Sequence, residues 1–406
     1  MACFVAVAGC SEARSERAQP PPTSDSAAVD AVSASADARR TVAPPLPDAG
    51  MPAQPNHLPS LARAPQCRPP SLDHHSRIDA RTGAALEHCE PLRTGLAKIS
   101  KSCGLGERKA KDLARLILSV PELDDATRAH AREVFERGRA LGRRADVFGL
   151  VGDSVTVSGD FMRPFSAARD RSVVLGEFAE KALALPDGRT VIDFFRSGRA
   201  EVLDGKELDP FRAFRAAMVG ARASFATDAP HGAPTPIDDL VRRISPAYAV
   251  VTFGANDAAY RVAPPEQIAD EFEKHTLAAV RALEDQGVVV ILSNEMRHGD
   301  QPGVKACPSD APQNDWRVAV GQNANSARAA EIACREHLPF IDLRHALDAA
   351  TNFGLGPDAV HLSSFKEGAG VLDDRGLDCG YNIRNFVTLL ALRRVVEAVD
   401  AARAPQ

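Results

Sequence analysis

The stretch VFGLVGDS at residues 147–154 runs from apolar side chains into a glycine and two polar residues. Similar short apolar runs recur along the chain, and each is about as long as a buried β-strand. Because these runs do not alternate between apolar and polar residues, both faces of the sheet should be covered, as in parallel sheets. We predict five strands, at Val147–Val151, Thr190–Phe195, Ala247–Phe253, Gly287–Ser293 and Leu338–Leu343.

Amphipathic helical patterns separate these runs. We expect helices at about 107–120, 123–142, 237–244, 264–283 and 384–402. Strands that alternate with helices predict an α/β fold, a flavodoxin-like three-layer α/β/α sandwich with a five-stranded parallel sheet, over residues 146–402. Ligands of such sheets bind beyond the carboxyl ends of the strands.

The N-terminal ten residues, MACFVAVAGC, resemble the lipobox of bacterial lipoproteins, in which Cys10 would carry the lipid. Against this interpretation, no Lys or Arg precedes the apolar run, and a chance apolar N-terminus is the alternative. Residues 11–65 are rich in Pro, Ala and Ser and predict a disordered tether. Together these features predict an exported lipoprotein, periplasmic or on the cell surface, that meets a membrane only through its anchor.

Residues 66–145 are expected to form a small helical extension that contains cysteines. Without Cys3 and Cys10, six cysteines remain, an even number that fits a compartment where disulfides form. The single pair that we predict is Cys89 with Cys103, because both lie in one short segment. A metal site at His74, His75, His88 and Cys89 is less favoured than a solvated loop, so no metal is expected.

Composition excludes several classes of function. The formal net charge is −5, and aromatic residues make up 5% of the chain, with Trp316 the single tryptophan. Neither a basic surface nor stacking platforms for bases are therefore expected, which argues against a nucleic-acid partner. The sequence contains no G-x-S-x-G, H-E-x-x-H, phosphate-loop or G-x-G-x-x-G motif.

Polar residues follow three of the predicted strands, at Gly152-Asp153-Ser154, at Gly254-Ala-Asn256-Asp257 and at Asp358-Ala-Val-His361. A serine hydroxyl becomes an effective nucleophile when an imidazole accepts its proton. A carboxylate then orients that imidazole and stabilises its charged form, and an amide N–H₂ can stabilise a developing oxyanion. Each motif alone could be a cap or a turn, but together they predict nucleophilic acyl transfer.

On these motifs the chain resembles the SGNH, or GDSL-type, hydrolase family over about residues 146–400. The resemblance implies the nucleophile Ser154, the base His361 and the orienting residue Asp358. It also implies an oxyanion hole formed by Ser154, Asn256 and a glycine, for which Gly220 is favoured over Gly198. Val155, Ala359 and Leu362 depart from the family pattern, and the loop 296–316 is expected to shape the substrate site. The segment Gly380-Tyr-Asn-Ile-Arg-Asn385 resembles a C-terminal feature of an exported bacterial branch.

The implied activity is hydrolysis of a carboxylic ester through an acyl-serine intermediate, without a cofactor. The substrate class is left open among O-acyl glycans, lipids and small esters, as is the oligomeric state. Two alternatives remain: acyl transfer to a sugar hydroxyl on the same fold, and a catalytically silent binding module at the cell surface.

Overall fold

The computed structural model describes residues 103–104, 110–168, 173–213, 215–259, 263–297, 315–358 and 360–400. All of them lie in one compact unit, residues 63–406. The predicted signal with Cys10, the tether over 11–65 and the segment 74–89, for which a solvated loop is favoured over a metal site, lie outside the described residues.

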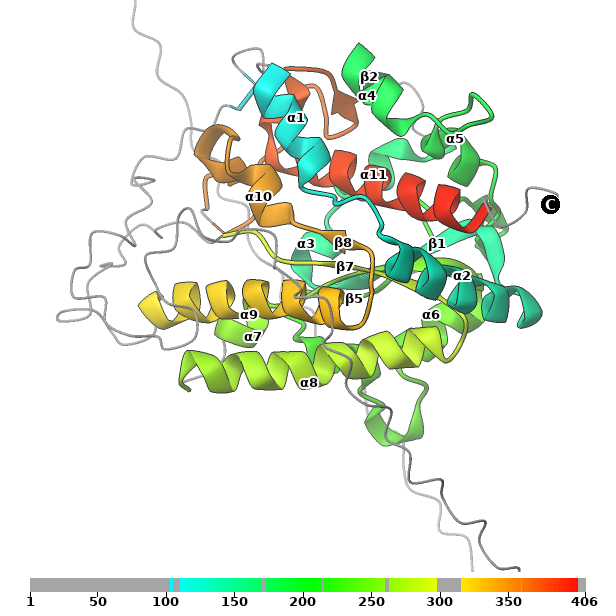
Figure 1. The fold of residues 1–406 in the computed structure, drawn as a ribbon, viewed down its shortest axis with the longest axis vertical. Coiled ribbons are helices and arrows are strands. Elements are labelled where there is room, and N and C mark those ends of the chain that lie inside the picture. The colour runs from blue at the N-terminus through cyan, green and yellow to red at the C-terminus, as the bar shows by residue number, and fades with distance from the viewer. Residues whose placement is uncertain are drawn as a thin grey trace, which may run out of the picture. The chain divides into compact units, whose positions relative to one another are not determined.

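The central sheet has five strands, in the order β5-β1-β6-β7-β8, and every pairing between them is parallel. The predicted α/β architecture with a five-stranded parallel sheet is therefore confirmed (Figure 1). The strands are β1 (Arg144–Gly152), β5 (Ala216–Ala217), β6 (Pro246–Thr252), β7 (Val289–Ser293) and β8 (Phe340–Ile341).

Successive residues of the three central strands enter two different hydrophobic clusters, one on each face of the sheet. In β1, Phe148 and Leu150 belong to one cluster, whereas Val147 and Val151 belong to the other. Because side chains alternate between the faces of a strand and both faces are covered, these strands are apolar at almost every position.

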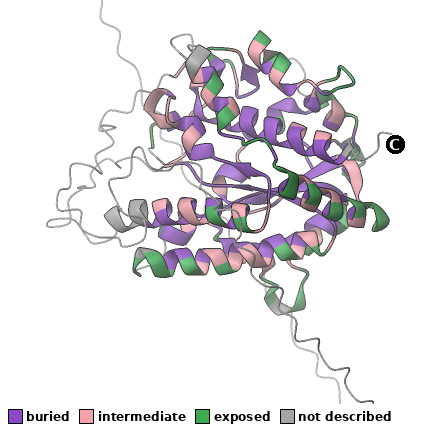
Figure 2. Ribbon diagram, viewed as in Figure 1, coloured by how far each residue is buried: buried purple, intermediate pink, exposed green. Residues whose placement is uncertain are grey.

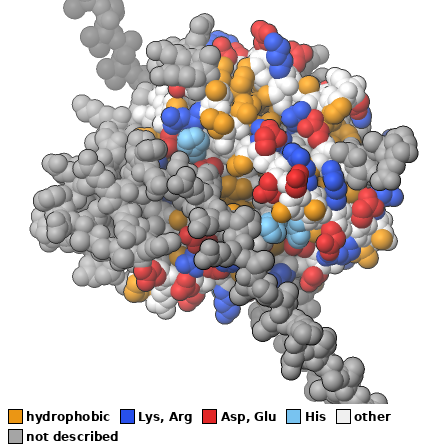
Figure 3. All heavy atoms as spheres, in the orientation of Figure 1, with side chains coloured by type: hydrophobic (Ala, Val, Ile, Leu, Met, Phe, Trp, Pro, Cys, Tyr) orange, Lys and Arg blue, Asp and Glu red, His pale blue; other side chains and the backbone are white. Residues whose placement is uncertain are grey.

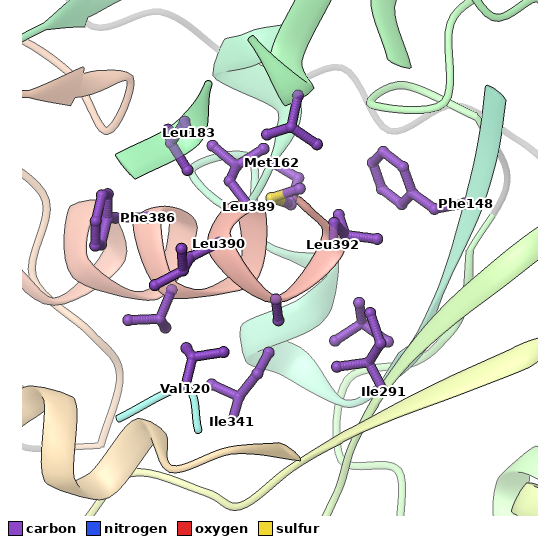
Figure 4. Packing of buried hydrophobic residues seen from close by; sticks show 14 of the residues in the cluster. Val120, Phe148, Met162, Leu183, Ile291, Ile341, Phe386, Leu389, Leu390 and Leu392 are labelled. Atoms are coloured by element: carbon purple, nitrogen blue, oxygen red, sulfur yellow. The ribbon is translucent and has the colours of Figure 1, made fainter. Parts of the chain in front are cut away.

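The two helical layers differ in how deeply they are buried. The helices α6 (Pro236–Ile244), α8 (Pro265–Glu284) and α9 (Asp315–Arg335) contribute to the cluster on one face. On the other face, α11 (Gly380–Asp400) is buried along most of its length, as Figure 2 shows. Its side chains share a cluster with Ile341 from β8 and with Val120 from the segment between α1 and α2 (Figure 4).

Five helices pack against α11, and of these α2 and α5 also contact the sheet: α1 (Ala110–Leu118), α2 (Asp125–Ala140), α4 (Glu177–Leu183), α5 (Val191–Arg196) and α10 (Leu343–Leu347). Residues of α1 and α2 thus share a core with the sheet. In α2, the Asp124 side chain caps the N-terminus by accepting a hydrogen bond from the Thr127 N–H.

The prediction of a strand at Thr190–Phe195 is wrong, because this segment forms helix α5. Thr190 and Asp193 form a reciprocal capping box, and Val191, Ile192 and Phe195 are buried on one side of the helix. The fifth strand of the sheet is instead β5, which is too short to leave a pattern in the sequence.

The remaining elements are short. A parallel pair joins β2 (Val174–Leu175) to β9 (Val371–Leu372), and β3 (Glu201–Leu203) pairs antiparallel with β4 (Lys206–Leu208). Two short helices, α3 (Ser154–Val157) and α7 (Ala255–Ala259), follow β1 and β6. Among the described residues, no helix combines the length and apolar character needed to cross a bilayer.

The predicted disulfide between Cys89 and Cys103 is also wrong. Cys103 is bonded to Cys379, which is 276 positions away and immediately precedes α11. Proximity along the sequence is a weak guide here, because the folded chain brings its early segment beside the start of the last helix. Cys334 is disulfide-bonded as well.

Candidate active site

Ser154 is the first residue of α3, directly beyond the carboxyl end of β1. Asp153 caps this short helix by accepting a hydrogen bond from the Val155 N–H at 3.1 Å. The turn is tight: a Cβ on Gly152 would lie 2.3 Å from the Thr156 Oγ1. The Ser154 side chain consequently lies at the carboxyl end of the sheet, where it is half-buried.

His361 and Asp358 meet Ser154 from the other end of the chain. The Ser154 Oγ lies 3.3 Å from the His361 Nε2, and the His361 Nδ1 lies 2.6 Å from the Asp358 Oδ2. The structure therefore brings together the three residues that the sequence predicted as nucleophile, base and orienting carboxylate. Because each contact is within hydrogen-bond reach, a proton can pass from the hydroxyl to the imidazole.

Asp358 also receives backbone N–H groups from Val360 and His361. Burial raises the pKa of Asp358, but these N–H bonds and the imidazole outweigh it, and the net pKa is lowered. Asp358 is thus held as the carboxylate, the form that fixes a proton on the His361 Nδ1. The side chains of His361 and Asp358 remain 45% and 53% exposed, so solvent reaches the pair.

The loop that carries this pair is closed at its base. Leu355 and Leu362 form an isolated antiparallel bridge, and the Gly356 N–H donates to the His361 carbonyl at 2.7 Å. Leu362, which departs from the family pattern, is buried, and so is Val155, the residue after Ser154. Ala359 lies outside the described residues.

Asn256 lies in α7, at the carboxyl end of the neighbouring strand β6. Its Nδ2 donates to the Asp153 Oδ2 at 3.1 Å and to the Ala221 carbonyl at 3.0 Å. The next residue, Asp257, accepts the Ala223 N–H. Asn256 and Asp257 together attach the segment after β5 to the nucleophile turn.

The two candidate glycines lie at different ends of the sheet. Gly220 follows β5 in a turn, with a φ of 76°, and its neighbour Ala221 is the residue bonded by Asn256. Gly198 lies against the Asp146 carbonyl, where a Cβ would approach within 2.1 Å. Asp146 belongs to the first half of β1, whereas Ser154 follows its last residue. Of the two glycines, Gly220 therefore lies at the same end of the sheet as Asn256 and Ser154.

Two carboxyl groups in this region are deeply buried. Burial raises the pKa of Asp153 to about 6, although the nearby Arg384 guanidinium opposes this shift. Burial likewise raises the pKa of Asp257 to about 6, even though the Ala223 N–H favours the carboxylate. Both groups can therefore change charge near neutral pH, beside the nucleophile turn.

The first turns of α11 touch both chain segments that form the site. The Asn385 side chain binds the segment after Ser154, accepting from the Met162 N–H and donating to the Asp160 carbonyl. The Asn382 side chain binds the segment after His361, accepting from the Phe365 N–H and donating to the Val371 carbonyl. This helix thereby sets the distance between the two segments.

Sequence reasoning missed Glu295, which lies two residues beyond β7 and is fully buried. The rule that singled out the other strand ends could have found it, since Asn294 and Glu295 are polar residues after a predicted strand. Among the described residues, no group of His, Cys, Asp and Glu side chains could hold a metal ion. Most of the predicted substrate-shaping loop 296–316, including residues 298–314, lies outside the described residues.

The face shown in Figure 3 carries acidic and basic side chains that are interspersed over the described part of the chain. The described residues on this face form no broad basic field of the kind that binds a nucleic-acid backbone.

The five-stranded parallel sheet carries the turn Gly152-Asp153-Ser154 after β1, and the comparison with family models identifies the class of protein that has this arrangement. The model of the GDSL-like lipase/acylhydrolase family matches residues 150–364, more than half of the chain. The chain therefore belongs to the GDSL-like lipase/acylhydrolase family. The comparison with curated proteins gives no match.

Several solved structures are similar to this chain at low sequence identity. A lipase/acylhydrolase from Enterococcus faecalis is 16% identical, with a TM-score of 0.32, and the match covers 61% of this chain and 94% of that one. A GDSL-like lipase from Bacteroides thetaiotaomicron is 16% identical, with a TM-score of 0.34, covering 65% and 98%. A protein from Bacteroides fragilis is 15% identical, with a TM-score of 0.35, covering 73% and 100%.

Proposed function

We propose that this protein is a serine esterase that hydrolyses carboxylic esters through an acyl-serine intermediate. One observation carries the proposal: the contacts from the Ser154 Oγ to the His361 Nε2 and from the His361 Nδ1 to Asp358, at 3.3 and 2.6 Å. Membership of the GDSL-like family supports a hydrolase. Geometry supports the roles of the individual residues.

In the first half of the reaction, the Ser154 Oγ attacks the ester carbonyl carbon while the His361 Nε2 accepts the hydroxyl proton. Asp358 stabilises the imidazolium that forms. The tetrahedral intermediate then collapses: the bond to the alcohol oxygen breaks, and His361 gives its proton to the leaving alcohol. In the second half, His361 takes a proton from water while the water oxygen attacks the acyl carbon. The bond from this carbon to the Ser154 Oγ then breaks, and His361 returns its proton to Ser154 as the acid leaves.

The oxyanion would be stabilised by the backbone N–H groups of Ser154 and Gly220 and by the Asn256 side chain. Both Asn256 N–H bonds are made to protein acceptors, Asp153 and Ala221. Asn256 therefore has to exchange one of these acceptors for the oxyanion as the tetrahedral intermediate forms. Donors of this kind act most strongly when they are already oriented, which the bond to Asp153 provides. The mechanism requires no metal or organic cofactor.

We further propose that the protein acts outside the cytoplasm. The disulfide between Cys103 and Cys379 supports this location, since such bonds persist mainly in oxidising compartments. The lipobox-like N-terminus supports attachment by a lipid at Cys10. Incorporation of radiolabelled palmitate into the wild-type protein and its loss in Cys10→Ala would test the anchor.

The decisive experiment measures hydrolysis of p-nitrophenyl acetate and labelling by a fluorophosphonate. Wild-type protein should turn over the ester and become labelled at one serine, and Ser154→Ala should lose both properties. Ser197→Ala is the matched control, because the Ser197 hydroxyl bonds only locally, to the Phe194 carbonyl. Equal turnover in Ser154→Ala would remove Ser154 from the mechanism.

Activity against a series of acyl chain lengths, together with acetate release from acetylated glycans, would define the substrate. The same reactions run with a polysaccharide acceptor would show whether the acyl group passes to a sugar hydroxyl instead of water. Failure of the folded protein to react with the fluorophosphonate would favour a silent binding module.

A further inference from the structure

Arg384 lies directly beneath the nucleophile turn. It projects from the second turn of α11, and its side chain is buried. Its guanidinium donates to the Thr156 Oγ1 at 3.1 Å and lies 3.9 Å from the centre of the Phe161 ring. Both partners belong to the segment that follows Ser154, so the guanidinium is held in place from the side of the nucleophile.

Asp153 is the carboxyl group through which this positive charge can act on the site. One of its oxygens accepts the Val155 N–H and the other accepts the Asn256 Nδ2. The same carboxylate thus shapes the turn that carries Ser154 and holds the amide that would stabilise the oxyanion. The charged and titratable groups that act on Asp153 are Arg384 from α11, His361 from its loop, Asp257 from α7 and Glu295 from the segment after β7.

Glu295 faces the same region from the end of β7. Its side chain is fully buried, and neither of its carboxyl oxygens has a hydrogen-bond partner among the described residues. Burial first, and then the charge of Asp153, raise its pKa well above the usual range. The other charged groups acting on it are Asp257, Arg344 and Arg384.

The hydrogen bonds decide which of the two carboxyl groups keeps the negative charge. Asp153 receives two N–H donors, which favour its ionised form, whereas Glu295 receives none from the described residues. In a coupled pair the proton stays on the group whose charge is less well stabilised. Glu295 is therefore the carboxylic acid, and the carboxylate that Arg384 stabilises is Asp153.

We propose that Arg384 is a positioning residue for the esterase reaction, which keeps Asp153 ionised so that Asp153 can hold the Asn256 amide and the Ser154 turn. This inference rests on the proposed function. Loss of the positive charge would leave Asp153 protonated over more of the neutral range. When Asp153 is protonated, one of its two oxygens becomes a hydroxyl and accepts hydrogen bonds only weakly. The hydrogen bond from Asn256 would then weaken, whereas substrate binding would be unaffected.

The test compares two substitutions at one position. Arg384→Gln removes the charge but keeps a polar N–H₂ group on a shorter side chain, whereas Arg384→Lys keeps the charge. Protein labelled with ¹³C at the aspartate side-chain carboxyl carbon is titrated by NMR, and the Asp153 signal is identified by its absence in Asp153→Asn. In the wild type this carboxyl should titrate at about 6. Arg384→Gln should raise that midpoint by roughly 1–3 pH units, and Arg384→Lys should leave it close to the wild-type value.

Glu295→Gln is the matched control for charge. Because Glu295 already carries its proton when Asp153 titrates, the neutral amide should leave the Asp153 midpoint unchanged. If Arg384→Gln does not fold, the double variant with Glu295→Gln removes the two buried groups together and should show the same raised midpoint. An unchanged midpoint in Arg384→Gln, or a lowered one in Glu295→Gln, would overturn the proposal.

Kinetics supply the second readout. In Arg384→Gln the acid limb of the kcat profile for p-nitrophenyl acetate should move to higher pH with KM unchanged, and Arg384→Lys should restore it. A merely structural loss would lower kcat at every pH without moving the limb. If the wild type shows no turnover that depends on Ser154, the proposed function fails, but the NMR titration still decides the role of Arg384.

Discussion

The Ser363 Oγ accepts a hydrogen bond from the Gly380 N–H at 3.0 Å, and thereby joins the loop of His361 to the first residue of α11. The Ser363 backbone makes two further bonds, its N–H to the Gly354 carbonyl and its carbonyl to the Tyr381 N–H. A Cβ on Gly380 would lie 2.0 Å from the Gly354 carbonyl oxygen, so the two backbones are in direct contact. The base of the proposed mechanism is thus positioned by the last helix.

Substitution of Ser363 by Ala should lower kcat by roughly tenfold or more and leave KM nearly unchanged. The hydroxyl acts on the base and not on the substrate, and a small displacement of His361 lengthens its contact with Ser154. Steady-state kinetics with p-nitrophenyl acetate would measure this, with Ser363→Thr as the conservative rescue. A raised KM with unchanged kcat would place Ser363 in substrate binding instead.

Substitution of Asp358 by Asn should lower kcat on the order of 10²–10⁴-fold. The amide cannot stabilise the imidazolium and favours the wrong tautomer of His361. Because the Asp358 side chain is about half exposed, the melting temperature should hardly change. Kinetics and thermal melts of the same preparation would separate the two effects, and a large loss of stability would indicate a structural role for Asp358.

Removal of the disulfide by the double substitution Cys103→Ser and Cys379→Ala should reduce the free energy of unfolding by about 2–5 kcal/mol. It should also lower kcat. Cys379 lies next to Gly380, and the hydrogen bond from the Gly380 N–H to the Ser363 Oγ positions the His361 loop. Urea denaturation and kinetics would measure the two changes.

The matched control for that variant is Cys334→Ser, which removes a disulfide-bonded cysteine from α9, on the other face of the sheet. It should lose stability but retain kcat. An equal loss of kcat in both variants would mean that the effect of the Cys103–Cys379 bond is not specific to the His361 loop.

Asp257 should make stability depend on pH. Its pKa is about 6 in the folded protein, against an ordinary value of 3.8. Between these values the folded state holds a proton that the unfolded state releases, so the free energy of unfolding falls as the pH rises through this window. Relative to Asp257→Asn, the wild type should lose about 2–3 kcal/mol between pH 4 and pH 7. Urea denaturation of both proteins at several pH values would measure this. A difference in the free energy of unfolding that stays constant from pH 4 to pH 7 would show that Asp257 does not titrate in this range.

Local pattern predicted the strands at 147–151, 247–253 and 287–293, because a strand buried on both faces needs apolar side chains at nearly every position. The same criterion failed at 190–195. There the buried residues Val191, Ile192 and Phe195 line one side of a helix that is only six residues long, and the capping box of Thr190 and Asp193 was the available signal. A short apolar run by itself does not separate the two structures.

The sequence alone determined the α/β class and the three motifs at strand ends, because apolar periodicity and residue chemistry are local properties of a chain. Only the tertiary structure decided the partner of Cys103, the end of the sheet at which Gly220 lies, and the burial of Arg384 and Glu295 near Asp153. The disulfide of Cys103 and the burial of Arg384 depend on how the start of α11 packs against segments more than two hundred residues away, and the place of Gly220 depends on the pairing of β5 with β1. Such contacts come from the collective packing of the core, which no short stretch of sequence encodes.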